Sequence, residues 1–212
     1  MESLDNQYVY WNKVSETKNF THPLVIEKLK PYLSKESQIL DFGCGYGRTC
    51  LELNSAGYKN VLGVDSSQKM IERGLKNNPY LRMLPLKNNL SELGKFDAII
   101  LFAVLTCIPT DDGQLKLIEH LSEHLKPNGI LYISDYWLET NERNLNRYME
   151  FEEKYGNYGV FELPDGAIFR HHSKEWIERL TSSFETKELF DCELTTMNGN
   201  QSSCFQFIGR KK

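Results

Sequence analysis

The sequence predicts an α/β fold with one doubly wound, mainly parallel sheet of seven strands and an antiparallel hairpin at its C-terminal end. Three observations lead to this prediction. Strand-like runs alternate with helix-like runs between residues 23 and 135, as in parallel sheets whose strands are joined by crossover helices. Residues 96–102, FDAIILF, form a continuous apolar run, as expected of a strand covered on both faces. Two further strand-like segments flank Met197-Asn198-Gly199-Asn200, which carries a turn signal.

The predicted elements follow in a regular order. Proline favours the first helical turn, so a helix is expected to begin at Pro23. Asp111 and Gln114 resemble a capping box ahead of apolar residues at helical spacing, which predicts another helix. A turn is expected at Pro127-Asn128-Gly129. Strands are expected at 38–42, 61–64, 80–84, 96–102, 130–133, 184–195 and 202–209, and further helices at 47–56, 66–76 and 173–182.

Two segments fall outside this alternation. Residues 136–172 hold eight aromatic side chains in 37 positions, whereas aromatic residues make up 12% of the whole chain. Part of this segment, 141–155, can form an amphipathic helix with Leu145, Tyr148, Met149 and Tyr155 on one side. The N-terminal segment 1–22 is also rich in aromatic residues. We therefore expect one domain, 1–212, with an N-terminal flap at 1–22 and a helical, aromatic lid inserted at 136–172.

Composition disfavours several classes of function. The net charge of −4, from 25 basic and 29 acidic residues, gives no basic surplus to attract phosphate backbones. The five cysteines lack metal-ligand spacing and are odd in number, which argues against a zinc site or a disulfide framework. No apolar stretch approaches the length of a membrane span, and no signal peptide is evident. The expectation is a cytoplasmic protein that uses no metal and binds neither nucleic acid nor membrane.

A glycine-rich turn follows the first predicted strand directly, in Asp41-Phe42-Gly43-Cys44-Gly45-Tyr46-Gly47. Glycines at such a turn let a ligand approach the backbone closely. Asp65 follows Gly45 by twenty residues, at the end of the second strand, where a carboxylate accepts hydrogen bonds from ribose hydroxyls. Taken singly, the glycines could serve only a turn and Asp65 only a helix cap. Their combination at this spacing favours a cofactor site. Arg48 stands where a nicotinamide-binding turn needs its third glycine, which argues against that cofactor.

Four motifs in this chain occur in a recognisable order. ILDFGCGYGR (39–48), VLGVDSSQKMIE (61–72), FDAIILFAVL (96–105) and LKPNGILYISD (125–135) resemble those of the class I S-adenosylmethionine-dependent methyltransferases, especially the small-molecule enzymes. They span residues 39–135, rather under half of the chain. The resemblance implies a Rossmann-like fold, S-adenosylmethionine as cofactor and a small-molecule acceptor.

The resemblance also implies roles for individual residues. The backbone of 43–45 would face the methionine end of the cofactor, Asp41 its amino group and Asp65 its ribose. The family usually binds adenine with an Asp after the third strand. Here Asn88 is the best candidate, with the Leu86 backbone as the alternative. The residues implied in cofactor binding are therefore Asp41, Gly43, Cys44, Gly45, Asp65, Ser66, Asn88, Phe102 and Ala103.

The acceptor site is expected to come from the flap and the lid, which lie outside the common motifs. A methyl transfer needs alignment, exclusion of water and sometimes removal of a proton. His171 and His172 are candidate general bases, because histidine titrates near neutral pH, and Asp135 is a rival. Cys107 has no second cysteine near it in sequence to suggest thiol chemistry. Candidate substrate contacts are Tyr8, Trp11, His22, Asp135, Tyr136 and Arg170.

Several functions remain open on the sequence alone. The leading hypothesis is an enzyme that methylates O, N or S of a small metabolite. A second is a non-catalytic domain that binds S-adenosylmethionine, and turnover would separate the two. A third is methylation of protein or RNA, against which the net charge weighs in the case of RNA. A nicotinamide oxidoreductase is the weakest alternative because of Arg48.

Overall fold

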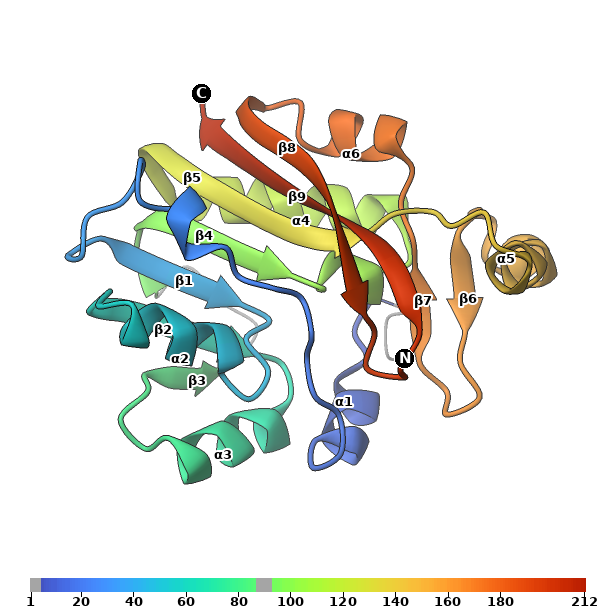
Figure 1. The fold of residues 1–212 in the computed structure, drawn as a ribbon, viewed down its shortest axis with the longest axis horizontal. Helices are drawn as coiled ribbons and strands as arrows, with labels where there is room; N and C mark the ends of the chain where they lie inside the picture. Colours follow the sequence, from blue (N-terminus) through green and yellow to red (C-terminus); the bar gives the residue numbers. More distant parts are fainter. Residues whose placement is uncertain (1–4, 87–92) are drawn as a thin grey trace.

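The computed structural model describes residues 5–86 and 93–212, which form a seven-stranded sheet at the centre of the molecule (Figure 1). The strand order is β3-β2-β1-β4-β5-β9-β8, with β1 to β5 parallel and β9 and β8 antiparallel. This confirms the predicted fold class, including the antiparallel ending. The strands are β1 Gln38–Phe42, β2 Asn60–Asp65, β3 Met83–Pro85, β4 Phe96–Phe102, β5 Leu125–Tyr136, β8 Phe184–Thr195 and β9 Gln201–Lys211.

Helices cover both faces of the sheet, so the central strands are apolar on both sides. Ile99 and Leu101 of β4 belong to the core under α4 and α6, while Ala98 and Ile100 belong to the core under α2 and α3. This explains the continuous apolar run, since successive strand residues point to opposite faces. The covering helices are α2 Arg48–Ser55, α3 Gln68–Asn77, α4 Asp111–His124 and α6 Lys174–Leu180. Within the described residues, every helix is too short or too polar to span a bilayer.

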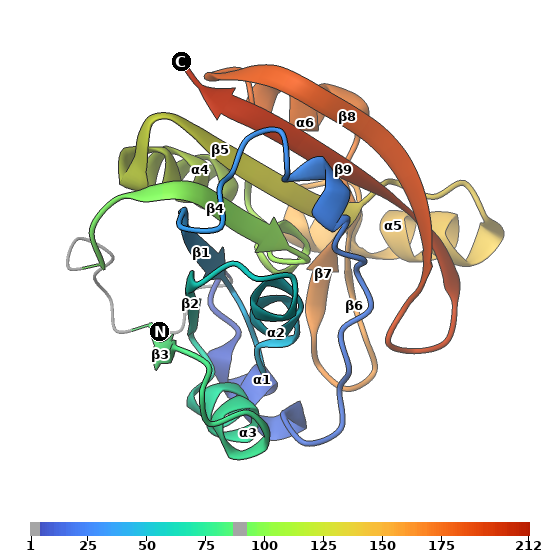
Figure 2. The ribbon, with the colours of Figure 1, turned by 60° about the vertical axis from the view of Figure 1, so that its left-hand side comes forward.

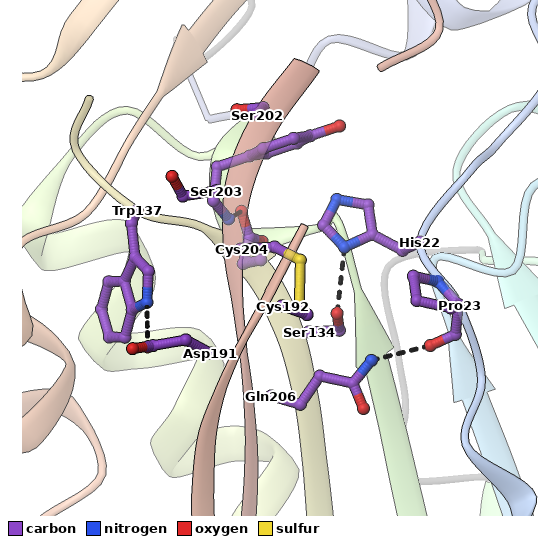
Figure 3. The surroundings of a disulfide bond; sticks show 12 residues. His22, Pro23, Ser134, Trp137, Asp191, Cys192, Ser202, Ser203, Cys204 and Gln206 are labelled. Carbon is purple, nitrogen blue, oxygen red and sulfur yellow. Dashed lines mark hydrogen bonds between the residues drawn. A yellow bond between two sulfur atoms is a disulfide. The ribbon is translucent and has the colours of Figure 1, made fainter. Parts of the chain in front are cut away.

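Three local predictions differ from the structure. No helix begins at Pro23; only the short 3-10 turn η1, Ile26–Lys28, forms, and the Pro23 carbonyl instead accepts a hydrogen bond from Gln206 of β9 (Figure 3). The N-cap of α4 is Thr110, whose hydroxyl accepts from the Gly113 amide. The expected turn at 127–129 lies inside β5 as an irregularity, with Asn128 in the left-handed region.

The flap and the lid segment lie together beyond the carboxyl ends of β1 and β4 (Figures 1 and 2). The flap contains a short helix, α1 Tyr8–Val14. The lid segment contains α5 Glu142–Tyr155 and a small hairpin of β6 Val160–Glu162 and β7 Ile168–Arg170. Side chains from both segments share one buried cluster, separate from the cores of the sheet: Tyr10, Tyr148, Phe161, Ala167 and Phe169.

The packing face of α5 was predicted wrongly. Tyr148 is buried as expected, but Leu145 and Met149 are exposed, the latter to 61%. Asn144 is buried in their place, one turn before Tyr148. The buried stripe is therefore rotated by about one position from the apolar stripe of the sequence, because α5 packs against the β6–β7 hairpin and not against the sheet.

A disulfide joins Cys192 of β8 to Cys204 of β9, contrary to the expectation from the odd cysteine count. The two residues are directly opposite in the antiparallel register, with Cα atoms 4.9 Å apart. Figure 3 shows the bond between the two strands, near His22. The pairing depends on strand register, which cysteine spacing in the sequence does not show. Cys44, Cys50 and Cys107 have free thiols.

Candidate functional site

A cavity of about 500 Å³ opens at the carboxyl ends of β1, β2 and β4. The strand order reverses between β1 and β4, and ligands of doubly wound folds bind at such a reversal. The glycine-rich turn and the ends of these strands form one part of the cavity wall, and the flap and lid form the other. Sequence-predicted residues that line it are Trp11, His22, Asp41, Gly43, Cys44, Asp65, Ser66, Phe102, Ala103, Tyr136 and His171. Asn88 lies outside the described residues.

The glycine turn is held in a conformation that other residues rarely adopt. Gly43 has a φ of +72°, and a Cβ there would lie 2.4 Å from a methyl carbon of Val104. The Gly43 and Cys44 amides donate to the Val64 carbonyl, at 2.8 and 3.0 Å. These bonds fix the turn against the end of β2. Glycine at this position therefore leaves room for Val104, and the backbone of the turn forms a fixed part of the cavity wall.

Asp65 connects the glycine turn to the start of α3. One carboxylate oxygen accepts from the Gly45 amide at 2.8 Å, and the other accepts from the Ser67 amide at 2.7 Å. Burial raises the pKa of Asp65, and these two amides oppose the rise. Each oxygen keeps a further lone pair, which a ribose hydroxyl can use. Asp65 thus has a structural role that leaves it able to bind a ligand.

Asp41 is a buried carboxylate in the cavity wall at the end of β1. It accepts a hydrogen bond from the Cys50 thiol at 3.2 Å. Burial raises the pKa of Asp41 to about 7, with the Cys50 hydrogen bond and Arg48 opposing. A cationic group placed next to Asp41 would favour its ionised form. The site therefore suits a ligand with an ammonium group.

The flap closes the cavity on the cofactor side through hydrogen bonds to the helices. The Asn12 side-chain oxygen accepts from the Lys69 amide at the start of α3. Arg73 of α3 donates to the carbonyls of Ser15 and Lys18, both at 2.7 Å. Arg48 donates to the His22 carbonyl. The last of these bonds gives Arg48, which follows the third glycine of the turn, a role in holding the flap.

Phe20 covers the middle of the glycine turn. Its ring stacks on Tyr46 with centroids 5.0 Å apart, and a ring carbon lies 1.9 Å from where a Cβ on Gly45 would be. Gly45 consequently lies beneath Phe20 and does not line the cavity, although sequence motifs placed it among the cofactor contacts. No local pattern in the sequence indicated Phe20, because its role depends on how the flap folds back.

We expect the flap to open when the cofactor enters, since it covers the glycine turn in this structure. Backbone amides of residues 8–22 should exchange hydrogen faster than those of β1 and β4 in the ligand-free protein, and should slow when S-adenosylhomocysteine is added. The lid segment 136–172 should respond in the same way once an acceptor is also present. Hydrogen exchange followed by mass spectrometry measures this. Full protection of both segments without ligand would show that they are fixed parts of the core.

The other end of the cavity is lined by a series of stacked rings. The His22 ring meets Tyr136 edge-on with centroids 4.5 Å apart, and Tyr136 stacks on His171 at 5.2 Å. His22 Nδ1 lies 3.0 Å from the Ser134 hydroxyl of β5 (Figure 3), and His171 Nδ1 lies 2.6 Å from the Tyr148 hydroxyl of α5. The series therefore leads from the sheet to the lid.

Both histidines of this series are neutral at physiological pH. Burial, and then the charge of Arg48, lower the pKa of His22 to about 3. Burial, and then Arg147, lower the pKa of His171 well below its ordinary value. His22 Nε2 is buried and has no hydrogen-bond partner. A neutral imidazole can accept a proton, so each ring is chemically able to serve as a base.

Four residues predicted for catalysis or substrate binding do not line the cavity. His172 has Nε2 3.0 Å from the Gln114 side-chain nitrogen and Nδ1 3.2 Å from the Tyr136 carbonyl. Asp135 is fully buried and accepts from the backbone amides of Thr106 and Tyr136. Arg170 pairs with Asp111 at 2.7 Å. Tyr8 lies on the outer side of α1, 39% exposed. We therefore propose no chemical role for these residues.

Several residues that line the lid end of the cavity were not predicted. They come from η3 Leu105–Cys107, α5, the β6–β7 hairpin and the β8–β9 turn. The sequence signal for them was the aromatic enrichment of the lid, which did not indicate which side chains face inward. These residues include Cys107, Arg143, Arg147, Phe161, Phe169, Met197 and Asn198.

Comparison with known proteins agrees with this geometry. A family model described as a methyltransferase domain matches residues 19–181. The crystal structure of an S-adenosylmethionine-dependent methyltransferase of Methanosarcina mazei has a TM-score of 0.80 and 25% identity, and the match covers 90% of this chain and 98% of that one.

Two of the curated relatives match over a smaller part of the chain. The ubiquinone biosynthesis O-methyltransferase of Rickettsia typhi is 27% identical over 206 residues, covering 79% of this chain and 81% of that protein. The trans-aconitate 2-methyltransferase of Deinococcus radiodurans is 30% identical over 147 residues, covering 65% and 52%. This chain matches only about half of the length of several curated relatives, from 43 to 52%.

Proposed function

This chain belongs to the S-adenosylmethionine-dependent methyltransferases, and we propose that it methylates O, N or S of a small metabolite. The observation that carries the proposal is the continuity of the cavity. A single space runs from the glycine turn and Asp65 to the rings of Tyr136 and His171, and the flap and lid cover it. Such a space suits a cofactor and a small acceptor bound end to end, which is the arrangement that methyl transfer requires.

The residues of the cavity fit the cofactor. The backbone at Gly43 and Cys44 gives close access for its methionine part, and the buried Asp41 suits its ammonium group. Asp65 has lone pairs for the ribose hydroxyls. Ser66 and Leu86 line the adjoining wall, where we place the adenine; Asn88 remains a proposed adenine contact. When bound, S-adenosylmethionine supplies an electrophilic methyl group on a sulfonium sulfur.

The chain's own residues align the acceptor, exclude water and receive a proton. Tyr136 and Trp11 provide flat apolar walls against which an acceptor can be oriented. An O–H or N–H acceptor forms its new bond to the methyl carbon as the carbon–sulfur bond breaks, and it releases one proton. We propose that neutral His171 takes this proton, and that His22 is the alternative base. An acceptor that is already ionised needs neither.

A small metabolite is favoured over a macromolecule by the enclosure of the site. The flap is bonded to α3 and also to the lid: the Gln7 side chain donates to the Ile168 carbonyl at 2.7 Å and accepts from the Ile168 amide at 2.8 Å. The net charge of −4 offers no attraction to RNA. Two of the relatives are named for small-molecule pathways or substrates, ubiquinone biosynthesis and trans-aconitate.

Calorimetric titration with S-adenosylmethionine, S-adenosylhomocysteine and NAD tests the cofactor. We expect both adenosyl compounds to bind and NAD to show no binding, because Arg48 occupies the position of the third glycine. Incubation with methyl-labelled cofactor and fractionated cell extract then tests the acceptor class. Label should appear in the small-molecule fraction. Label confined to protein or RNA would contradict the small-metabolite proposal, and binding without any transfer would indicate a non-catalytic domain.

A further inference from the structure

We infer that the acceptor carries a carboxylate, which Arg147 binds at the lid end of the cavity with support from Arg143. This inference rests on the proposed function and specifies the substrate class of the same site. Both arginines belong to α5, one helical turn apart, and both line the cavity. No motif that identifies the cofactor site includes either residue.

Arg147 is held as a rigid, partly desolvated cation. Its guanidinium carbon lies 3.4 Å from the centroid of the Phe161 ring. Its Nε is buried and has no hydrogen-bond partner. Stacking on an aromatic ring fixes the plane of a guanidinium, and a fixed plane presents its N–H groups as a fork that matches a carboxylate.

Two other arginines near the cavity, the cavity-lining Arg48 and the buried Arg170, are paired with acidic side chains. Arg170 pairs with Asp111 at 2.7 Å, and Arg48 pairs with Glu52 at 2.6 Å. In the described part of the chain, no carboxylate lies within ion-pair distance of Arg147 or Arg143. Arg143 is exposed, but Arg147 is partly buried, and a cation removed from water is costly unless an anion compensates it. A ligand in the cavity is the partner that this arrangement lacks.

Glu139, whose charge acts on Arg147 through space, is hydrogen-bonded to other groups. Glu139 accepts from the Ser202 hydroxyl at 2.8 Å and from the Ser203 amide at 2.6 Å. The acidic side chains in the cavity wall lie elsewhere, with Asp41 and Asp65 at the cofactor end and Asp5 bonded to Thr110. The charged side chains that line the lid end of the cavity are therefore Arg143 and Arg147, which are complementary to an anionic acceptor.

The walls between the two ends define the rest of the acceptor. Phe161, Phe169 and Met197 line the lid end together with the arginines. From the sheet, the rings of His22, Tyr136 and His171 lead toward the same place, and His171 meets Phe161 edge-on with centroids 5.0 Å apart. The acceptor that fits has a nucleophile near the sheet, an apolar or flat body along these rings, and a carboxylate at Arg147.

Binding of a carboxylate would also affect the proposed base. Burial is the main cause that lowers the pKa of His171. Arg147, His172 and Arg143, in decreasing order of effect, lower it further. An anion beside the two arginines would offset their contribution and raise the proton affinity of His171. Arg147 by itself weakens His171 as a base, and the bound carboxylate of the correct acceptor would relieve that effect.

Binding assays on the protein saturated with S-adenosylhomocysteine test the inference. The probes are hydroxy- and amino-substituted aromatic and aliphatic carboxylates, each paired with its own uncharged amide, and thermal shift followed by calorimetry measures binding. We expect some carboxylates to bind the wild type more tightly than their amides. Arg147→Leu should weaken those carboxylates by about tenfold and remove the preference over the amide, and Arg147→Lys should retain part of it.

Arg179→Leu is the matched control, because Arg179 lies on α6 over Trp176 and does not line the cavity. It should leave the carboxylate preference unchanged. Affinity for S-adenosylhomocysteine, titrated separately, should be the same in all variants. The inference is overturned if no carboxylate binds the wild type better than its amide, or if Arg147→Leu keeps the preference. Failure of the wild type to bind the cofactor product would instead contradict the proposed function.

Discussion

Replacing His171 with alanine is expected to lower turnover by about a hundredfold or more with a hydroxyl or amine acceptor, which is the usual contribution of a general base. Affinity for S-adenosylmethionine should stay nearly unchanged, because His171 lies at the ring series and not among the cofactor motifs. The loss should shrink with an acceptor that is already ionised at the assay pH, since no proton then has to be removed. Steady-state kinetics with each class of acceptor measures this.

The geometry of His171 sets a condition on this role. Its Nδ1 lies 2.6 Å from the Tyr148 hydroxyl, so only Nε2 is available to an acceptor. A base role requires the tautomer in which Nδ1–H donates to the Tyr148 oxygen and Nε2 is unprotonated. His171→Asn should keep a donor to Tyr148 while removing Nε2. It should therefore be as slow as the alanine variant, with a smaller loss of thermal stability.

The pH profile provides an independent check. Because burial and neighbouring cations hold the pKa of His171 well below 6.5, the ring stays unprotonated as the pH falls through 6.5. A base with a lowered pKa loses its capacity only when the pH falls through that lowered value. We therefore expect kcat/KM to show no acid limb near 6.5 in the wild type. An acid limb at that pH would assign the proton transfer to a less buried group.

Near-normal turnover in both His171 variants would exclude this residue as an essential base. His22 would then be tested as His22→Gln, since its unpartnered Nε2 makes it the alternative. If neither histidine matters, catalysis proceeds by alignment alone, and the enclosure of the cavity becomes its main contribution.

Replacing Asp65 with alanine is expected to weaken S-adenosylmethionine binding by about tenfold or more, because charge-assisted hydrogen bonds contribute about 1.5–3 kcal/mol each. The ribose hydroxyls lose their acceptor. The amides of Gly45 and Ser67 lose theirs too, so the glycine turn is no longer tied to α3. Calorimetry measures the affinity, and thermal unfolding measures the accompanying loss of stability.

Asp97→Ala is the control for this substitution. Asp97 also accepts a backbone amide, from Gln38 at 2.7 Å, and it pairs with Lys126 at 2.8 Å. It does not line the cavity. Its replacement should reduce thermal stability with little change in cofactor affinity. If Asp65→Ala behaves like Asp97→Ala, with stability lowered and affinity unchanged, Asp65 is only a structural cap.

The order of strands and helices was predictable because its signals are local. The apolar run of β4, the glycines after β1 and the turn before β9 each determine backbone conformation within a few residues. The cofactor end of the site was predictable for the same reason. Asp41, Gly43 and Asp65 sit at the ends of strands, and parallel strands bring their carboxyl ends to one edge of a sheet.

The lid end of the site was decided by the tertiary structure. The apolar stripe of α5 predicted Leu145 and Met149 on the buried side, yet both are exposed and Arg147 lines the cavity. The residue pattern of a helix shows which side chains share a face, but the element that packs against the helix decides which face is buried. Here that partner is the β6–β7 hairpin, which sequence reasoning did not find.

The sequence alone thus determined a doubly wound sheet and a cofactor-binding edge, because strand ends and tight glycine turns follow from short-range conformational preferences. Only the tertiary structure separated His171 from His172, paired Cys192 with Cys204 and placed Phe20 over Gly45. Adjacent residues in a strand point to opposite sides, and residues far apart in sequence meet only through register and packing. Those long-range contacts decide which side chains reach the acceptor.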